Sequence, residues 1–349
     1  MPWLNIRGHD ALVDNFRKLL EANRLPHAML FVGPPSVGKT TFARAFAQGL
    51  LCEKHLPQEL APCGTCPGCK QVIAETHPDF LAVRRPEDKQ ALPVDSIREL
   101  CGKLSLKPMS GKFRIAVVED ADNLTDESAN AFLKTLEEPG PGSVLILIGS
   151  TPDTQLETVV SRCQVVRFQP LSAEDIEAIL IDRGLISQST NARQLADQAE
   201  GSVARALALA DNEYQDARST VIHELVDSGA PLAPKVAKVI EDLAKNSSKE
   251  PATQRRRAIL ILEDLSRFFR DVLWSGAGLA PPSGDSAWGE SAHKIAAYCS
   301  PEDVFAIADR CLLAITQIQY NANMPLALSA WASDVCRILN ESRASARTR

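Results

Sequence analysis

One eight-residue segment, GPPSVGKT (33–40), constrains the fold of this chain more than any other feature of its sequence. It follows an apolar run, AMLFVG (28–33), and precedes a stretch with helical spacing, so it joins a buried strand to a helix. Glycines at such a junction let backbone N–H groups curl around phosphate oxygens at a helix N-terminus. The segment predicts an α/β domain with a site for nucleotide phosphates; the alternative is an ordinary glycine turn.

The residues of this loop have separate expected roles in binding ATP with Mg²⁺. Gly33 and Gly38 allow the tight turn. Lys39 is expected to neutralise β- and γ-phosphate oxygens, and Thr40 to hold the Mg²⁺ ion. The expected nucleotide-binding residues are Gly33, Pro34, Pro35, Ser36, Val37, Gly38, Lys39, Thr40 and Thr41.

Short apolar runs alternate with stretches of helical spacing up to about residue 170. This alternation predicts a mostly parallel five-stranded sheet covered by helices on both faces. The expected strands are 28–33, 79–84, 114–120, 144–149 and 164–168.

The pattern is helical from Ser172 onward, and Ser172 is expected to cap the first of these helices. Residues 275–291 are rich in Gly, Pro and Ser and are predicted to form a loop, and the tail 341–349 is predicted to fray. We therefore expect three domains. They are a nucleotide-binding domain over 1–170, a small helical lid over 171–211 and an all-α domain over 212–349.

Composition argues against a membrane or secreted protein. No window approaches eighteen uncharged apolar residues, and the start of the chain lacks the apolar run of a signal peptide. We expect a cytoplasmic protein, in which the nine cysteines stay reduced. The formal net charge is -6, so any contact with DNA is expected to need a local patch or a partner.

Four cysteines follow the phosphate loop with the spacing C-x10-C-x2-C-x2-C. They are Cys52, Cys63, Cys66 and Cys69. Four thiolates suit tetrahedral Zn²⁺ and leave no open position for water, so the expected site is structural. Redox thiols and unconnected core cysteines are the alternatives. A metal would stabilise an insertion too small to fold on its own core.

The run RIAVVED (114–120) ends in two acids, Glu119 and Asp120. A strand beside the phosphate loop is expected to present acids to the metal ion and to the attacking water. Solvated surface charge is the alternative for both residues.

The run NAFLKTLEEPGPGSVLILIGSTPDTQLETVVSRCQVVRF (130–168) resembles the bacterial clamp-loader ATPases of the AAA+ class. With RLPHAMLFVGPPSVGKT and the cysteine cluster, the resemblance covers nearly all of the first 170 residues. It implies an AAA+ domain with an inserted zinc module at about 52–69, followed by a helical lid and an oligomerisation collar. It also implies partners similar to the γ/τ and δ subunits, a sliding clamp and primed DNA reached mainly through the complex, at the nucleoid during replication.

The same resemblance implies roles for single residues. Arg162, in the sequence SRC, corresponds to the arginine that reaches ATP held by a neighbouring subunit, and Ser150 and Thr151 occupy the polar sensor position. An arginine finger stabilises charge that develops on the transferred phosphoryl group. An ion pair local to its own fold is the alternative for Arg162.

Two departures from the family pattern bear on hydrolysis. Motor subunits place Asp before Glu at the end of the strand, whereas here Glu119 precedes Asp120, and Ala204 takes the place of an arginine that here follows as Arg205. Arg205 is expected either to miss the γ-phosphate or to be a solvated surface charge. We expect a stator-like clamp-loader subunit with weak or no ATPase activity. The alternatives are a γ/τ-like motor and an AAA+ remodeller outside replication.

Overall fold

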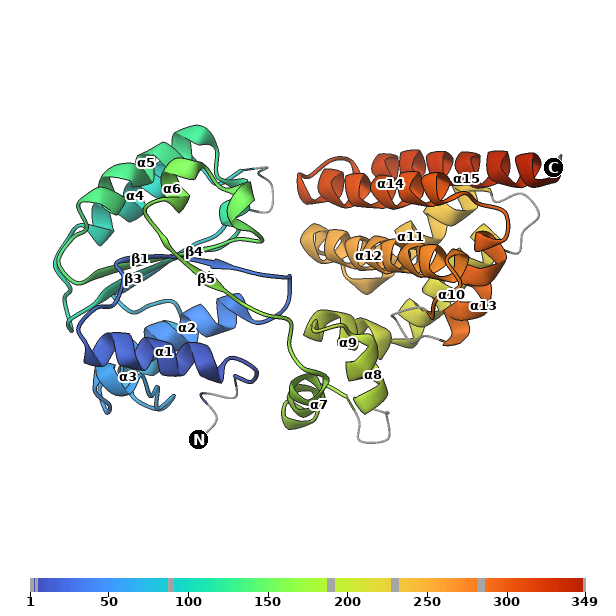
Figure 1. Ribbon diagram of the computed structural model, residues 1–349. Coiled ribbons are helices and arrows are strands. Elements are labelled where there is room, and N and C mark those ends of the chain that lie inside the picture. The colour runs from blue at the N-terminus through green and yellow to red at the C-terminus, as the bar shows by residue number, and fades with distance from the viewer. Residues whose placement is uncertain are drawn as a thin grey trace. The chain divides into compact units, whose positions relative to one another are not determined.

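The computed structural model describes residues 6–86, 91–186, 192–226, 232–280 and 286–347, together with Trp3 and Lys89 (Figure 1). The chain divides into two compact units, residues 1–185 with 201–203, and residues 186–200 with 204–349. Among the described residues, no helix combines the length and the apolar character needed to cross a membrane.

The first unit contains a five-stranded sheet in the order β2-β3-β4-β1-β5. Every pairing is parallel, so the predicted sheet is confirmed. The strands are β1 (Ala28–Val32), β2 (Phe80–Val83), β3 (Arg114–Val118), β4 (Ser143–Ile148) and β5 (Gln164–Arg167). Because β1 and β3 both pair with β4, the residues that follow these three strands meet at one edge of the sheet.

Helices cover both faces of this sheet (Figure 1). Side chains alternate between faces along a strand, so Met29 and Phe31 pack with one set of helices while Leu30 and Val32 pack with the other. The first set is α1 (Asp10–Glu21), α2 (Lys39–Leu50) and α3 (Pro67–Ile73), and the second is α4 (Val94–Leu104), α5 (Asp126–Glu137) and α6 (Glu157–Val160).

Short 3-10 turns punctuate the loops of the first unit at Pro57–Glu59, Ala121–Asn123 and Pro152–Thr154. Helix α7 (Ala173–Asp182) follows the sheet, and Ser172 caps it as predicted, because its hydroxyl accepts the Asp175 N–H at 3.0 Å. The zinc module expected at 52–69 lies between α2 and β2 and ends inside α3.

The remaining helices build an all-α core. They are α8 (Ala192–Gln198), α9 (Val203–Leu209), α10 (Asn212–Val226), α11 (Ala233–Ser247), α12 (Pro251–Gly276), α13 (Ser286–Ala296), α14 (Pro301–Gln319) and α15 (Met324–Arg347). Helix α12 packs against α11, α13 and α14, and α15 packs against α11 and α14. The buried aromatic residues of this core include Phe268, Phe269 and Trp331.

Two sequence predictions for this helical part need correction. The loop predicted over 275–291 is wrong from residue 286, where α13 begins, because Trp288, Ala292 and Ile295 recur at helical spacing and are buried. Residues 281–285 lie outside the described part. The frayed tail is wrong as far as residue 347, because α15 continues there and Ser342 is buried, donating to Asp303 at 2.9 Å.

Candidate nucleotide and metal sites

The phosphate loop connects the end of β1 to the start of α2. Gly33 has φ 146 and Gly38, the residue before the helix, has φ 96, conformations that glycine adopts at little cost. A Cβ atom at Gly33 would also collide with the carbonyl oxygen of Phe168. Pro34, Pro35 and Ser36 are exposed, as is Thr41, whereas Val37 is buried and Thr40 is half-buried.

Lys39 begins α2 and turns back over the loop. Its Nζ atom donates to the carbonyl oxygens of Gly33 at 2.5 Å and of Pro34 at 2.7 Å. Burial lowers the pKa of Lys39, and the negative charge of Asp122 acts in the opposite direction. The ammonium group is therefore held among oxygen acceptors at a helix N-terminus, where phosphate oxygens would also be favoured.

The two predicted acids follow β3 in different environments. Glu119 is half-buried, and one of its carboxylate oxygens accepts a hydrogen bond from Arg44 on α2 at 3.0 Å. Asp120 is exposed, with φ 56 in the left-handed region. The left-handed turn at Asp120 ends the extended chain, so the two neighbouring acids have different surroundings.

Asp122 is a site residue that the sequence reading missed. Its carboxylate accepts bonds from the Ser150 N–H at 2.8 Å, the Thr154 hydroxyl at 2.5 Å and the Gln155 amide at 2.9 Å. It therefore ties the chain after β3 to the chain after β4, where the expected sensor residues Ser150 and Thr151 are exposed. The sequence signal that could have identified Asp122 was the presence of a third acid within four residues of the end of β3.

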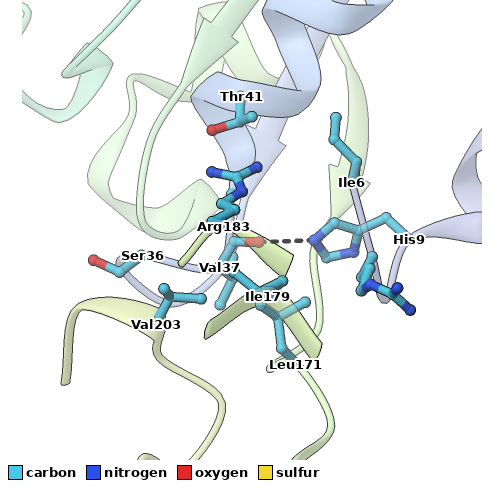
Figure 2. Close-up of a pocket in the computed structure, with 11 residues that line it drawn as sticks. Ile6, His9, Ser36, Val37, Thr41, Leu171, Ile179, Arg183 and Val203 are labelled. Atoms are coloured by element: carbon cyan, nitrogen blue, oxygen red, sulfur yellow. Dashed lines mark hydrogen bonds between the residues drawn. The ribbon is translucent and has the colours of Figure 1, made fainter. Parts of the chain in front are cut away.

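A cavity of about 200 Å³ adjoins the phosphate loop (Figure 2). Its lining is largely apolar with a few polar groups, contributed by Ile6, Arg7, His9, Ser36, Val37, Gly38, Thr41, Leu171, Ile179, Arg183 and Val203. His9 is buried, and its Nε2–H donates to the carbonyl oxygen of Val37 at 2.8 Å, drawn as a dashed line in Figure 2. His9 thus holds the loop at Val37, a role that no motif indicated.

The four predicted cysteines gather in one cluster, with their sulfur atoms all within 4.8 Å of one another. Cys52 and Cys66 are 4.0 Å apart, and Cys63 and Cys69 are 3.9 Å apart. Zinc–thiolate bonds of about 2.3 Å in a tetrahedron place sulfur atoms about 3.8 Å apart. The cluster therefore fits a tetrahedral zinc ion, and the described cysteines are all free thiols.

The surroundings of two of these thiols differ. Hydrogen bonds from the backbone and hydroxyl of Thr65 lower the pKa of Cys63 to about 5, and the Cys66 N–H donates to the same sulfur at 3.3 Å. Burial raises the pKa of Cys69. Donor groups aimed at sulfur are typical of thiolate ligands, and a metal ion would supply the positive charge that Cys69 needs to lose its proton.

Arg162 follows α6 and is partly exposed. Its Nε atom donates to Glu137 at 3.0 Å, and a second nitrogen lies 2.7 Å from the same oxygen, with 36% of the arginine side chain exposed. Another guanidinium nitrogen donates to the Thr158 carbonyl at 3.0 Å. The local ion pair weighed for this residue is therefore present, and it leaves the guanidinium at the surface.

Arg205 differs from the surface charge weighed in the sequence analysis. It is buried on α9, and its Nε atom lies 2.8 Å from Asp264 on α12. Asp264 also accepts the Tyr214 hydroxyl at 3.0 Å, and Arg218 lies 3.4 Å from it. Burial lowers the pKa of Arg205, and Asp264 acts against this shift. The interpretation of Arg205 as solvated charge is wrong, because the acids of its own core surround it.

Comparison with known proteins agrees with this geometry. The profile of the family described as DNA polymerase III, delta subunit matches residues 8–172. The chain is 32% identical to DNA polymerase III subunit delta' of Escherichia coli over 269 residues, which are 76% of each chain. It is also 32% identical to the Bacillus subtilis delta' subunit over 204 residues, 58% of this chain and 60% of that protein.

Relatives named tau are matched over a smaller share of their own length than the Escherichia coli delta' subunit. DNA polymerase III subunit tau of Escherichia coli is 32% identical over 212 residues, 59% of this chain and 32% of tau. The delta' subunit of Escherichia coli, in contrast, is matched over three quarters of its length. The chain belongs to the delta' family of DNA polymerase III clamp-loader subunits, with the tau/gamma subunits as close relatives.

Proposed function

We propose that this chain is the δ′-type stator of a replicative clamp loader, which helps to place a sliding clamp on primed DNA. The observation that carries the proposal is the 32% identity to a delta' subunit over 76% of both chains. Its expected partners are subunits similar to γ/τ and δ, the sliding clamp and, through the complex, DNA. The expected location is the bacterial cytoplasm, at the nucleoid during replication. We retain the division into nucleotide-binding domain, lid and collar.

ATP binding is part of this proposal. The phosphate loop supplies Lys39 and the start of α2 for the phosphates, and the adjoining apolar cavity suits the nucleoside part of the molecule. Thr40, Glu119 and Asp120 are the candidates for contact with Mg²⁺ and its water. The four cysteines would hold a structural zinc ion, which supplies folding energy and takes no part in hydrolysis.

The γ/τ-like motor is the second candidate, and the complete phosphate-loop motif favours it. Three features favour the stator. Asp120 stands where motors have glutamate, it is exposed in a left-handed turn, and Arg205 is engaged by Asp264. A base that is misplaced by about 1 Å loses much of its catalytic effect.

The trans arginine is tested by reconstituting the loader with its partner subunits. Arg162→Ala should assemble normally and retain ATP binding by the isolated chain. It should slow clamp loading, because the charge that develops on the transferred phosphoryl group at one neighbouring site loses its positive partner. The loss at a single site can reach about 10³-fold. Total ATPase should fall only in part, because the other sites keep their own arginines. Arg162→Lys keeps the charge without the planar guanidinium fork, so it should restore little of the clamp-loading rate.

Glu137→Gln provides the matched control. It breaks the local ion pair of Arg162 and keeps the arginine, so loading should stay near wild type. If Glu137→Gln slows loading as much as Arg162→Ala, the role of Arg162 is the local ion pair. Failure of Arg162→Ala to assemble would also contradict the trans role.

A further inference from the structure

One arginine joins the region of the cysteine cluster to the predicted acid of the nucleotide site. Arg44 lies on α2, the helix that begins with Lys39, and Glu75 lies two residues beyond α3, the helix that contains Cys69. The Nη2 atom of Arg44 donates to Oε1 of Glu75 at 2.9 Å and to Oε1 of Glu119 at 3.0 Å. A single nitrogen thus bridges the two carboxylates.

The backbone at Glu75 is unusual for a glutamate. Its φ of 56 places it in the left-handed region, where helices commonly end on glycine. This conformation is unfavourable for a residue with a side chain, because its Cβ atom crowds the following carbonyl oxygen. Arg84, which follows β2, forms a second ion pair with Glu75. A strained residue with two cationic partners indicates that its side chain has a role at this position.

Helix α3 is itself fixed between the cysteine cluster and α2. Cys66 caps its N-terminus, and the carbonyl oxygen of Cys69 accepts the Gln48 amide from α2 at 3.0 Å. A Cβ atom at Gly68 would come within 2.6 Å of the Leu51 carbonyl oxygen, so the two backbones are in close contact. An ion on the thiolates would therefore fix the start of α3, and the chain just beyond its other end presents Glu75.

The bridge leaves Glu119 able to bind a further group. Only Oε1 takes the bond from Arg44, and a carboxylate has about four acceptor positions. The side chains of Arg44 and Glu119 are 36% and 20% exposed, so the pair contributes little to stability. Its main effect is on the position of the carboxylate, because without Arg44 the like charges of Glu75 and Glu119 would face each other.

We propose that Arg44 and Glu75 are positioning residues of the nucleotide site. Glu75 holds the guanidinium of Arg44, and Arg44 fixes the carboxylate of Glu119, the acid assigned to Mg²⁺. The inference rests on the proposed ATP binding. The inference also explains why the phosphate loop and the cysteine cluster are close in the sequence. The zinc module would support Glu119, an acid of the phosphate site.

The test is the magnesium gain, the ratio of the ATP Kd in magnesium-free buffer to the Kd in saturating Mg²⁺, measured by calorimetry on the full chain. Glu119→Gln should lower the gain. Arg44→Gln should lower it by about 10-fold, the usual effect of losing a partner of a metal-binding carboxylate. Glu75→Gln should lower it less. The double variant Arg44→Gln/Glu119→Gln should lose no more than Glu119→Gln alone.

Arg84→Gln is the matched control, because it removes a partner of Glu75 without touching the bridge to Glu119. Its gain should equal that of wild type. Zinc content should stay constant in all these variants. The magnesium-free Kd should stay constant in Arg44→Gln, Glu75→Gln and Arg84→Gln, which excludes unfolding. Lys39→Ala should weaken binding in both buffers and so marks the phosphate site itself.

Two outcomes separate this inference from the proposed function. If wild type binds ATP with a clear magnesium gain that Arg44→Gln leaves unchanged, the positioning role is wrong and ATP binding stands. If wild type shows no ATP binding, both fail. An equal loss in Arg84→Gln and Glu75→Gln would also overturn the inference, because the effect would then follow surface charge and not the bridge.

Discussion

Asp79 illustrates at the residue scale how a buried charge is held in the first unit. The residue is fully buried, yet it accepts hydrogen bonds from Met109, Ser110 and Arg114, with distances to Arg114 of 2.9 and 3.0 Å. Burial opposes the charge of this carboxylate, but the hydrogen bonds outweigh burial and lower its pKa to about 2. Asp79 thereby fixes the chain between α4 and β3, the strand that leads to Glu119.

This lowered pKa predicts a pH dependence of stability. An unfolded aspartate has a pKa of about 3.9, so the contribution of Asp79 is complete above that value and is lost as the pH falls towards 2. Urea unfolding of wild type should lose about 2 kcal/mol more than that of Asp79→Asn between pH 6 and pH 2. Asp153→Asn, at an exposed position, should follow wild type. Parallel curves for wild type and Asp79→Asn would refute the assignment.

At the scale of elements, buried polar contacts hold helices together in both units. In the first, α3 is anchored to α2 by Gln48, and Glu75, two residues beyond α3, reaches Arg44. In the second, Arg205 on α9 pairs with Asp264 on α12. Removal of one partner from such a buried pair leaves an uncompensated charge, so these contacts are expected to matter for element position.

The helix α3 gives a prediction at this scale. Cys66→Ser with Cys69→Ser should abolish the binding of one zinc ion per chain and loosen α3, because two thiolates are too few for tight binding. Metal analysis and hydrogen exchange over residues 52–75 measure both effects. Cys101→Ser, outside the cluster, should keep the metal. Zinc retained in the double variant would show that the ligands lie elsewhere. If the double variant loses the metal but keeps the magnesium gain of wild type, the cysteine cluster does not influence Glu119.

At the scale of the whole molecule, similarity to a delta' subunit extends over 76% of the chain. The delta' family assignment follows from the alignments. In the proposed function, turnover would depend on the placement of Glu119 and Asp120, and the left-handed turn at Asp120 sets the two acids in different surroundings. The chain is therefore expected to bind ATP more readily than it hydrolyses it.

Steady-state hydrolysis by the purified chain should be slow, well below about 1 per second, the lower end of typical enzyme turnover. Exchanging the order of the acids, with Glu119→Asp and Asp120→Glu, should raise this rate if their order is the main defect. A phosphate-release assay on wild type, the exchanged variant and Lys39→Ala separates hydrolysis by this site from contamination. Turnover at motor-like rates by wild type would favour the γ/τ-like alternative.

The sheet, the phosphate loop and the cysteine set could be predicted from the sequence, because each depends on local spacing. An apolar run of five residues ending in glycine specifies a buried strand and a turn, and Phe31 and Gly33 are placed as expected. The cysteine spacing predicted a shared site, and the four sulfur atoms do lie within 4.8 Å of one another. The loop predicted over 275–291 failed from residue 286, because burial of Trp288 and Ile295 outweighs the local Gly and Ser content.

The contacts between distant residues could not be predicted from the sequence, because they depend on how the elements pack. Arg44 and Glu119 are 75 positions apart, and they pair because α2 packs on the face of the sheet to which β3 contributes Ile115 and Val117. Asp122 reaches Ser150 for a similar reason, since β3 and β4 end at the same edge. Burial of Arg205 depends on Asp264 from another helix. Local patterns record the spacing of residues along one element, whereas these contacts arise from the packing of elements, which no short window of sequence encodes.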